Sequence, residues 1–266
     1  MHAALNGTLA DDGELGIAPG DRGLTLGDGL FETIAVRAGR PRRLDAHLAR
    51  LRAGLAALGF TAEPELARPV HDVIAANGLE TGTIRLTVTR GPAGRGVVPP
   101  EAETPTVLVT AGTGAPPETS VAAVISERVR RNEHSPGSAL KSLSYLDTVL
   151  ARQDAAARGA ADAIVLNTAG NVAEATVANL AAVIDGRAVT PPVTGGALPG
   201  VVRAEAVAAG ELAEATLTPA MLRRADEIVL INALGVRPVT QLDGQPVGSG
   251  TRGELAALMR ARLTAE

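Results

Sequence analysis

The residue of this chain best suited to covalent chemistry is Lys141, in the segment from Ser138 to Asp147. Ser144 with an acidic residue three positions later has the pattern of a capping box, so we expect a helix from about Ser144 to Arg158. A helix N-terminus disfavours a nearby cation, and the neutral amine is the form that Schiff-base chemistry requires. Basic residues here are overwhelmingly arginine. The ordinary role of a lysine is a solvated surface side chain, and the choice of lysine at this position counts against that role and for a nucleophile.

A candidate anion site lies at the segment Leu198–Val202, which precedes a predicted helix. Backbone amides at a helix N-terminus bind anions, and Gly200 permits the backbone to approach a ligand closely. Among the histidines, His47 lies near the apolar stripe of another predicted helix, and we expect it to be a buried, hydrogen-bonded structural residue. The other three histidines do not have the spacing of metal ligands, so no catalytic metal is predicted.

Two predicted strands would position side chains near these segments. Residues 31–37 read as one strand, and residues 83–90 alternate apolar and polar side chains as a strand with one buried face does. The apolar side of the second strand holds Ile84, Leu86 and Val88. Its polar side, which includes Arg85, is either an ordinary solvated face or the wall of a site.

Two helices are predicted in the same half of the chain. Residues 45–58 form an amphipathic helix that begins at Asp45 as its N-cap and ends before Gly59. A second helix extends from about Glu65 to Ala76. The leucines that define the stripe of the first helix are Leu44, Leu48, Leu51, Leu55 and Leu58.

The remaining pattern indicates an α+β protein with two lobes. Residues 106–110 form a further strand, and the glycine- and proline-rich residues 111–117 form a connector. We therefore expect a smaller N-terminal lobe over residues 1–112, a linker over residues 113–119 and a larger lobe over residues 120–266 that carries Lys141. The strands expected in the second lobe cover residues 122–129, 163–166, 177–184 and 227–231, with helices after Gly200 and near the C-terminus.

Composition removes several classes of function. The 266 residues contain no cysteine, which excludes disulfides and cysteine nucleophiles. Aromatic residues are 1% of the chain and the net charge is −4, so neither base stacking nor a basic field favours nucleic-acid binding. No window is apolar enough for a membrane span, and the N-terminal residues lack the pattern of a signal peptide. We expect a soluble cytoplasmic protein with no membrane partner.

Five motifs occur together in the order found in one known family. The chain resembles the class IV, or fold type IV, pyridoxal-phosphate enzymes over essentially its whole length, with the two-lobed fold of the D-amino-acid aminotransferases. Each motif is weak alone, and five at compatible spacings are specific. They are Gly27–Thr33, His47–Leu51, Lys141–Leu146, Asn167 through Glu174 to Asn179, and Thr190–Pro192 with Ala197–Arg203.

The resemblance assigns roles residue by residue. It implies that Lys141 holds pyridoxal 5'-phosphate covalently and moves protons, and that Glu174 pairs with the pyridine nitrogen. Arg50 matches the phosphate-binding arginine, although helical periodicity alone would make it a surface side chain. Val202 stands where the family often has a hydroxyl residue, so its backbone amide would serve alone. The further cofactor contacts that the resemblance implies are Tyr145, Leu198, Gly200, Val201, Asn232 and Ala233.

Three segments are most similar to the 4-amino-4-deoxychorismate lyases of this family. These are Asn232–Leu234, the Phe31–Thr33 segment that ends in a threonine able to assist proton transfer, and the double Arg-Gly pattern of residues 90–96. The implied reaction converts 4-amino-4-deoxychorismate into 4-aminobenzoate and pyruvate, a step towards folate, with Lys141 and Thr33 as catalytic residues. Arg95 or Arg85 would bind a substrate carboxylate.

Two alternatives remain, and the resemblance also implies an assembly. The first alternative is a class IV aminotransferase acting on branched-chain or D-amino acids with the same lysine. The second is a cofactor-binding protein without catalysis, which the presence of both Lys141 and Glu174 disfavours. The family resemblance implies a homodimer that acts on a small-molecule substrate.

Overall fold

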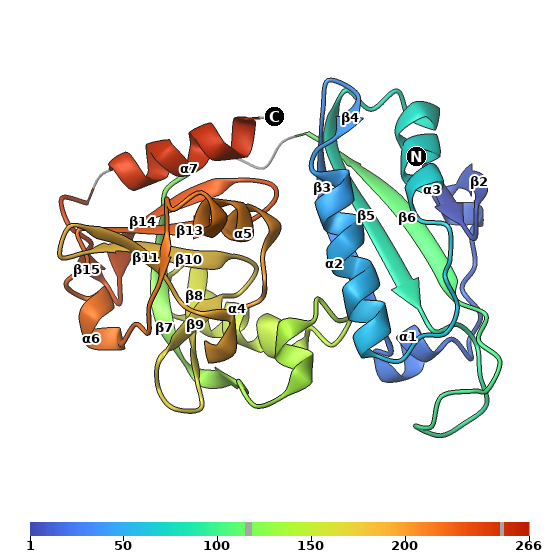
Figure 1. The fold of residues 1–266 in the computed structure, drawn as a ribbon, viewed down its shortest axis with the longest axis horizontal. Helices are drawn as coiled ribbons and strands as arrows, with labels where there is room; N and C mark the ends of the chain where they lie inside the picture. The colour runs from blue at the N-terminus through green and yellow to red at the C-terminus, as the bar shows by residue number, and fades with distance from the viewer. Residues whose placement is uncertain (115–118, 251–252, 266) are drawn as a thin grey trace. The chain divides into compact units, whose positions relative to one another are not determined.

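A computed structural model describes residues 1–114, 119–250 and 253–265, which form a mixed α+β fold (Figure 1). The α+β prediction is therefore confirmed. The chain divides into two compact units, the first comprising Met1–Ala115 with Leu140–Ser144 and the second comprising Pro116–Ala139 with Tyr145–Glu266. Of the linker expected at residues 113–119, residues 115–118 lie outside the described part of the chain. No helix within the described residues is both long and apolar enough to cross a membrane.

The first unit is built on a six-stranded antiparallel sheet in the order β2-β1-β6-β5-β3-β4. The longest pairing joins β3 to β5, from Gly29 opposite Thr89 to Arg37 opposite Thr81. The strands are β1 (His2–Leu5), β2 (Thr8–Asp11), β3 (Gly29–Arg37), β4 (Arg40–Pro41), β5 (Thr81–Thr89) and β6 (Thr106–Thr113).

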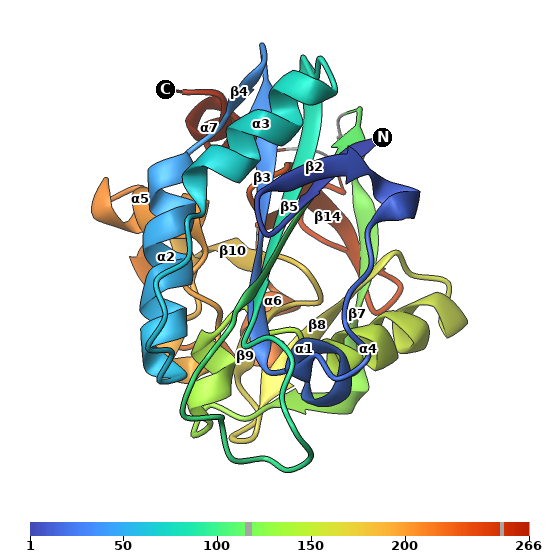
Figure 2. The same ribbon diagram turned by 90° about the vertical axis from the view of Figure 1, so that its right-hand side faces the viewer.

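The helices α2 (Leu44–Ala57) and α3 (Ala67–Ala76) lie on the same side of this sheet (Figures 1 and 2). They pack on the apolar face that the alternation of β5 predicted, where the side chains of Ile84, Leu86 and Val88 are fully buried. The leucine stripe of α2 is also confirmed. Leu48, Leu51 and Leu55 are buried in the same cluster, and Leu44 and Leu58 pack at its margin. The short helices of this unit are η1 (Asp12–Glu14) and α1 (Arg22–Leu26).

The helix starts differ from the predicted ones. Helix α2 begins at Leu44, with Arg43 as its N-cap at a positive φ of 54°, so Asp45 lies in the first turn and the N-cap prediction is wrong. Helix α3 begins at Ala67, and the Glu65 carboxylate accepts hydrogen bonds from the amides of Ala67 and Arg68. Glu65 therefore satisfies amides of the first turn without belonging to the helix.

The segment around Lys141 also differs from its predicted place, because Leu140–Ser144 are grouped with the first unit. The Phe31 amide donates to the Lys141 carbonyl at 3.0 Å, and the Leu143 amide donates to the Gly29 carbonyl at 3.0 Å. A backbone segment from the middle of the sequence thus continues the pairing of β3. The connector also begins later than predicted, since residues 111–113 belong to β6.

The second unit is built on a nine-stranded mixed sheet. The order is β12-β11-β10-β13-β14-β7-β8-β9, with β15 paired to β14. Its strands are β7 (Val121–Arg131), β8 (Asp162–Asn167), β9 (Val172–Ala175), β10 (Asn179–Ile184), β11 (Arg187–Thr190), β12 (Ala213–Glu214), β13 (Glu227–Ile231), β14 (Val236–Leu242) and β15 (Gln245–Pro246). Its helices are η2 (Pro136–Ala139), α4 (Leu146–Ala157), η3 (Val193–Gly195), α5 (Val201–Ala208), α6 (Pro219–Leu222) and α7 (Glu254–Thr264).

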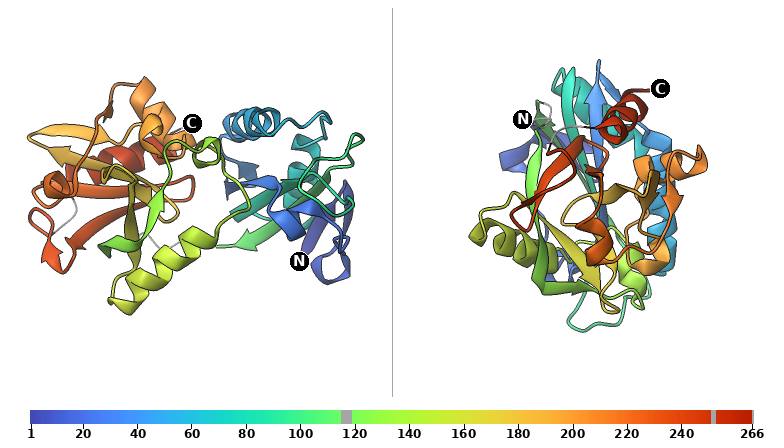
Figure 3. Two further views of the ribbon diagram at one scale, coloured as in Figure 1. Left: turned by 90° about the horizontal axis from the view of Figure 1, so that it is seen from below. Right: turned by 90° about the vertical axis from the view of Figure 1, so that its left-hand side faces the viewer.

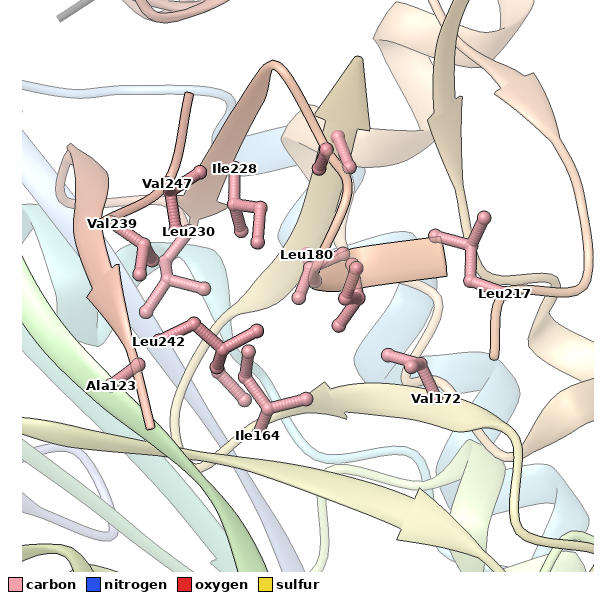
Figure 4. Close-up of a cluster of buried hydrophobic side chains, with 14 of the residues drawn as sticks. Ala123, Ile164, Val172, Leu180, Leu217, Ile228, Leu230, Val239, Leu242 and Val247 are labelled. Carbon is pink, nitrogen blue, oxygen red and sulfur yellow. The ribbon is translucent and has the colours of Figure 1, made fainter. Parts of the chain in front are cut away.

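Alternate residues of these strands fill separate cores, as the period of two requires. Ile228 and Leu230 of β13 point into the cluster drawn in Figure 4, together with Leu180 of the adjacent strand β10 and Ile164 of β8. Val229 of the same strand packs on the other face, beneath α5 and α7. Helix α4 packs on the face of β7 and β8 that carries Val124 and Val165 (Figure 3). Both faces of this sheet are therefore buried along its central strands.

The start of α4 also departs from the sequence prediction. The helix begins at Leu146 with Tyr145 as its N-cap and without a side-chain cap, so the predicted capping box of Ser144 and Asp147 is wrong. The propensity of a serine for a helix N-cap is overridden here, because the residues up to Ser144 follow β3 of the first unit.

Candidate active site

Lys141, the only lysine in the sequence, lies beside strand β3. Its Nζ lies 4.4 Å from the centroid of the Phe31 ring, and the Phe31 side chain is buried. Since α4 begins only at Leu146 and a helix dipole acts within its first turn, the dipole argument for this lysine is wrong. The environment of Lys141 within the first unit is set instead by β3 and by the ring of Phe31.

Thr33 and Arg85 belong to the same neighbourhood. Phe31 and Thr33 are two residues apart on β3 and share one face, and Arg85 of β5 lies directly opposite Thr33 in the register. The Arg85 guanidinium carbon lies 3.7 Å from the centroid of the Phe31 ring. The first unit thus brings together the predicted catalytic lysine, the predicted catalytic threonine and one predicted substrate-binding arginine. This face of the sheet is opposite to the one that α2 and α3 cover.

Arg50 lies on the helix-covered face, where it is held by Glu32. The Glu32 carboxylate, 1% exposed, accepts hydrogen bonds from Arg50 Nε at 2.8 Å and Arg50 Nη2 at 2.5 Å, and lies 2.7 Å from His47 Nδ1. Burial raises the pKa of Glu32, but the hydrogen bonds from His47 and Arg50 outweigh it and hold the pKa below its ordinary value. The prediction of a buried, hydrogen-bonded His47 is confirmed. Arg50 is oriented by a buried carboxylate rather than lying loose on the surface.

Arg95 lies outside both groups. It is exposed in the long connection between β5 and β6, and within the described residues it forms no ion pair. Both candidate substrate-binding arginines belong to the first unit: Arg85 contacts the ring of Phe31, as Lys141 does, whereas Arg95 lies on the connection between β5 and β6.

Glu174 is the centre of the predicted site residues in the second unit. It lies in β9, opposite Val165. One carboxylate oxygen accepts a hydrogen bond from the Leu198 amide at 2.9 Å, and the other lies 3.2 Å from Arg131 Nε. The Glu174 carboxylate is thus held from two sides by groups of the chain itself.

The segment after Leu198 is held by Asn179 and leads into α5. The Asn179 side-chain amide donates to the Leu198 carbonyl at 2.8 Å. A Cβ added to Gly200 would lie 1.9 Å from Asn179 Oδ1, so only glycine fits. Gly200 is the N-cap of α5 and no side chain among the described residues caps the first turn, which leaves its amides, including Val201 and Val202, directed at the helix entrance.

Val202 occupies the position at the start of α5 where the family often has a hydroxyl residue. Its side chain is 2% exposed and packs in the cluster with Ala206 of α5 and Leu255 of α7. Because its side chain is directed into this core, Val202 can contribute to an anion site only through its backbone amide. The sequence prediction for Val202 was a contact through the amide alone, and the packing is consistent with it.

The turn after β13 carries the last predicted cofactor contacts. Asn232 Oδ1 accepts hydrogen bonds from the amides of Leu234 and Gly235, at 2.9 and 3.1 Å, so this side chain shapes the turn itself. Ala233 is half-buried at the start of that turn, and Tyr145 is half-buried at the start of α4. The second unit therefore carries Tyr145, Glu174, Leu198, Gly200, Val201, Val202, Asn232 and Ala233, and the first carries Lys141, Thr33, Arg50, Arg85 and Arg95.

Comparison with known proteins decides the family. Residues 29–242 match the family model described as amino-transferase class IV. This chain belongs to the class IV aminotransferase family. It is therefore an enzyme that depends on pyridoxal 5'-phosphate, as its resemblance implied.

Class IV relatives with different reactions are similar to this chain over nearly its full length. A D-alanine aminotransferase of Bacillus licheniformis is 30% identical, covering 99% of this chain and 96% of its own. A solved structure of the branched-chain amino acid aminotransferase of Escherichia coli has a TM-score of 0.91 at 26% identity, covering 97% of this chain and 92% of its own. A structure of the 4-amino-4-deoxychorismate lyase of Pseudomonas aeruginosa has a TM-score of 0.85 at 34% identity, covering 98% and 97%.

The described residues fit the cofactor of a class IV enzyme. The helix entrance at Gly200 offers backbone amides of the kind that bind a phosphate group, and Asn179 fills the space that a Cβ would need. A carboxylate at Glu174 is the group that pairs with a protonated pyridine nitrogen. Lys141 supplies the amine. The chemistry of this donor set therefore agrees with pyridoxal 5'-phosphate.

Sequence reasoning assigned no role to three residues that hold these groups in place, namely Glu32, Arg131 and Asn179. Glu32 did carry a signal, because it occupies a core-facing position of a strand, where an acidic residue needs a buried partner. Asn179 ends one of the recognised motifs but received no role, and Arg131 carried no signal, since its partner Glu174 is distant in the sequence and only the fold brings the two together.

Proposed function

We propose that this class IV enzyme is a 4-amino-4-deoxychorismate lyase that releases 4-aminobenzoate and pyruvate. The observation that carries the proposal is the grouping of Lys141, Thr33 and Arg85 around Phe31. A base, a hydroxyl and a cation on one sheet face are the groups that an elimination from a carboxylated substrate needs. The 34% identity with the lyase of Pseudomonas aeruginosa supports the same assignment.

The proposed roles divide between binding and proton transfer. Arg50 and the amides at Gly200, Val201 and Val202 bind the cofactor phosphate, and Glu174 pairs with the pyridine nitrogen. Leu198 packs on the cofactor ring, and Tyr145, Asn232 and Ala233 complete its surroundings. When bound, pyridoxal 5'-phosphate supplies an electron sink that stabilises negative charge at the substrate.

Lys141 and Thr33 move the protons in this proposal. Lys141 removes the proton from ring carbon C4 of the substrate, and the carbon–oxygen bond to the enolpyruvyl group then breaks. Thr33 or Lys141 protonates the leaving group, which becomes pyruvate, and the ring becomes aromatic. Arg85 or Arg95 binds a substrate carboxylate. The proposed reaction requires no second substrate.

The second candidate function is transfer of an amino group between amino acids and 2-oxo acids. It is favoured by the name of the Bacillus licheniformis relative, a D-alanine aminotransferase. An aminotransferase uses the same lysine but returns a proton to the cofactor carbon, so its cofactor alternates between two forms and requires an acceptor.

The decisive experiment uses the purified enzyme with 4-amino-4-deoxychorismate and no 2-oxo acid. We expect continuous release of equal amounts of pyruvate and 4-aminobenzoate, with the cofactor spectrum returning to its starting form. Borohydride reduction of the resting enzyme should attach one molecule of cofactor irreversibly to each chain. Lys141→Ala should abolish both this covalent label and turnover. Amino-group exchange between amino acids and 2-oxo acids without pyruvate release from 4-amino-4-deoxychorismate would instead establish an aminotransferase.

A further inference from the structure

The connection between β5 and β6, from Arg90 to Pro105, contains no helix or extended strand (Figure 2). Connections of this length without secondary structure are uncommon in compact domains and are usually functional. It carries Arg95, one of the two candidate substrate-binding arginines. Its side chains are exposed around this residue, with Val97 at 78% and Val98 at 80%.

The backbone of this loop is nevertheless held by a buried guanidinium. Arg22, the first residue of α1, is 3% exposed. Its Nη1 donates to the Gly96 carbonyl at 2.9 Å and to the Val98 carbonyl at 3.3 Å, and its Nη2 donates to the Val97 carbonyl at 2.8 Å. One side chain thus binds three successive carbonyls directly after Arg95.

The charge of Arg22 is neutralised within the same cluster. Its Nε donates to an Asp28 carboxylate oxygen at 2.7 Å, and Arg90 Nε donates to the same oxygen at 2.9 Å. Arg90 is 2% exposed and also pairs with Glu103, while its Nη2 donates to the Leu58 carbonyl at 2.8 Å. Both ends of the loop, at Arg90 and Glu103, are therefore fixed by the network that holds its tip.

A buried arginine is costly unless its donors are satisfied, and here both Nη atoms of Arg22 are satisfied by carbonyls of one loop. The bonds from Arg22 go to main-chain oxygens, so they set the path of the backbone whatever the exposed side chains are. Gly96 adopts a φ of +123°, a backbone conformation that residues other than glycine rarely adopt. The loop thus has a single enforced path at the residue that follows Arg95.

We propose that Arg22, balanced by Asp28, is a positioning residue that fixes the loop so that Arg95 recognises a carboxylate of the substrate. This inference rests on the proposed lyase function for the identity of that substrate. Arg22 acts through the loop backbone and does not touch the substrate. Its removal should therefore loosen substrate binding while the cofactor site, held by other residues, keeps its cofactor.

The position of the loop can be measured without any activity. Trypsin cleaves after exposed arginines in segments that open locally, and Arg95 is exposed in this loop. We expect cleavage after Arg95 to be at least tenfold faster in Arg22→Met than in the wild-type holoenzyme, with the fragments identified by mass spectrometry. Gly96→Ala is the second variant, because its added Cβ meets no atom within 4 Å but its backbone conformation becomes strained.

A matched control separates this effect from general destabilisation. Arg203 is 4% exposed, donates to the Pro191 carbonyl at 2.7 Å and pairs with Glu214 in the second unit. Arg203→Met also removes a buried arginine, and we expect it to leave the rate of cleavage after Arg95 unchanged. Wild-type cleavage rates after Arg95 in Gly96→Ala and in any Arg22→Met that folds would overturn the positioning role.

Kinetics then test the recognition step. In Gly96→Ala and Arg22→Met we expect the KM for 4-amino-4-deoxychorismate to rise about tenfold, with kcat within a factor of two and an unchanged cofactor spectrum. Faster cleavage after Arg95 with an unchanged KM would overturn the recognition role of the loop. If the wild-type enzyme releases no pyruvate, the proposed function fails, and the proteolysis result still decides whether Arg22 holds the loop.

Discussion

Glu32 shows how a single buried side chain connects the stability of this protein with its site. Its carboxylate is 1% exposed and is bound by His47 and Arg50, both from α2. The same contact anchors α2 to β3 and orients the arginine that we propose for the cofactor phosphate. Loss of this carboxylate leaves Arg50 and His47 without their shared partner. This loss is destabilising, because charged groups are buried only at high cost unless they are paired.

We predict that Glu32→Gln is destabilising at pH 7, by about 3–5 kcal/mol, the usual cost of breaking a buried ion pair. The folded-state pKa of Glu32 lies below its ordinary value of 4.5. The unfolded state then binds more protons below that pH, so the stabilisation is complete above pH 4.5 and is lost as the pH falls through the folded pKa. Urea unfolding measured at pH values from 7 down to 3 should show that the difference in the free energy of unfolding between wild type and variant becomes smaller as the pH falls.

A control for simple loss of charge is Glu63→Gln, since Glu63 is exposed. Its stability should follow that of the wild type over the whole pH range. A Glu32→Gln deficit that stays constant down to pH 3 would show that the carboxylate charge does not stabilise the fold. Cofactor titration of the same variant should also show weaker binding, because Arg50 is no longer oriented.

At the scale of elements, the entrance to α5 depends on the contact between Gly200 and Asn179. We predict that Gly200→Ala weakens cofactor binding at least tenfold, because the new Cβ would lie 1.9 Å from Asn179 Oδ1 and must displace the segment that presents the helix amides. Asn179→Ser in the same chain should restore part of the affinity by removing the clash. Equilibrium dialysis with pyridoxal 5'-phosphate measures both.

The matched control is Gly16→Ala, because a Cβ at Gly16 meets no atom within 4 Å. This variant should bind the cofactor as the wild type does. Equal affinities of Gly200→Ala and the wild type would mean that the helix entrance does not bind the phosphate.

Elements with a strong local period were predictable from the sequence, and those set by distant pairing were not. The leucine stripe of α2 and the alternation of Ile84, Leu86 and Val88 in β5 depend only on neighbours a few residues away. The path of residues 140–144 along β3 depends on hydrogen bonds to Gly29 and Phe31, more than a hundred residues earlier. No local pattern contains that information, and the predicted capping box at Ser144 was wrong for the same reason, although the helix itself forms at Leu146–Ala157.

The site shows the same division. The motifs around Lys141, Glu174 and Gly200 are contiguous in sequence and could be recognised together. The residues that orient them, such as Arg131 for Glu174, are distant from their partners in the sequence. Nothing in the local sequence around such a residue distinguishes it from other polar residues of a strand. Sequence reasoning thus found groups proposed to contact the cofactor and missed those that hold such groups in place.

At the scale of the whole molecule, the first unit exposes apolar side chains on α1 and on the loop between β5 and β6, which Arg22 connects. Arg22 of α1 joins the two segments through its hydrogen bonds to the carbonyls of Val97 and Val98, whose side chains are 78% and 80% exposed. Leu24 is 70% exposed and Leu26 is 46% exposed. Exposed apolar surface of this kind is typical of protein interfaces.

We predict that the protein is a homodimer and that this apolar surface contributes to its interface. Light scattering of the wild type at micromolar concentration should give about twice the chain mass of 26.9 kDa. Leu24→Asp should give a monomer, since it places a charge in an interface that burial would have to desolvate. Leu258→Asp changes a leucine that is 40% exposed on α7 of the second unit, and it should remain dimeric. A wild-type monomer would contradict the dimer, whereas a dimeric Leu24→Asp would place the interface on another surface.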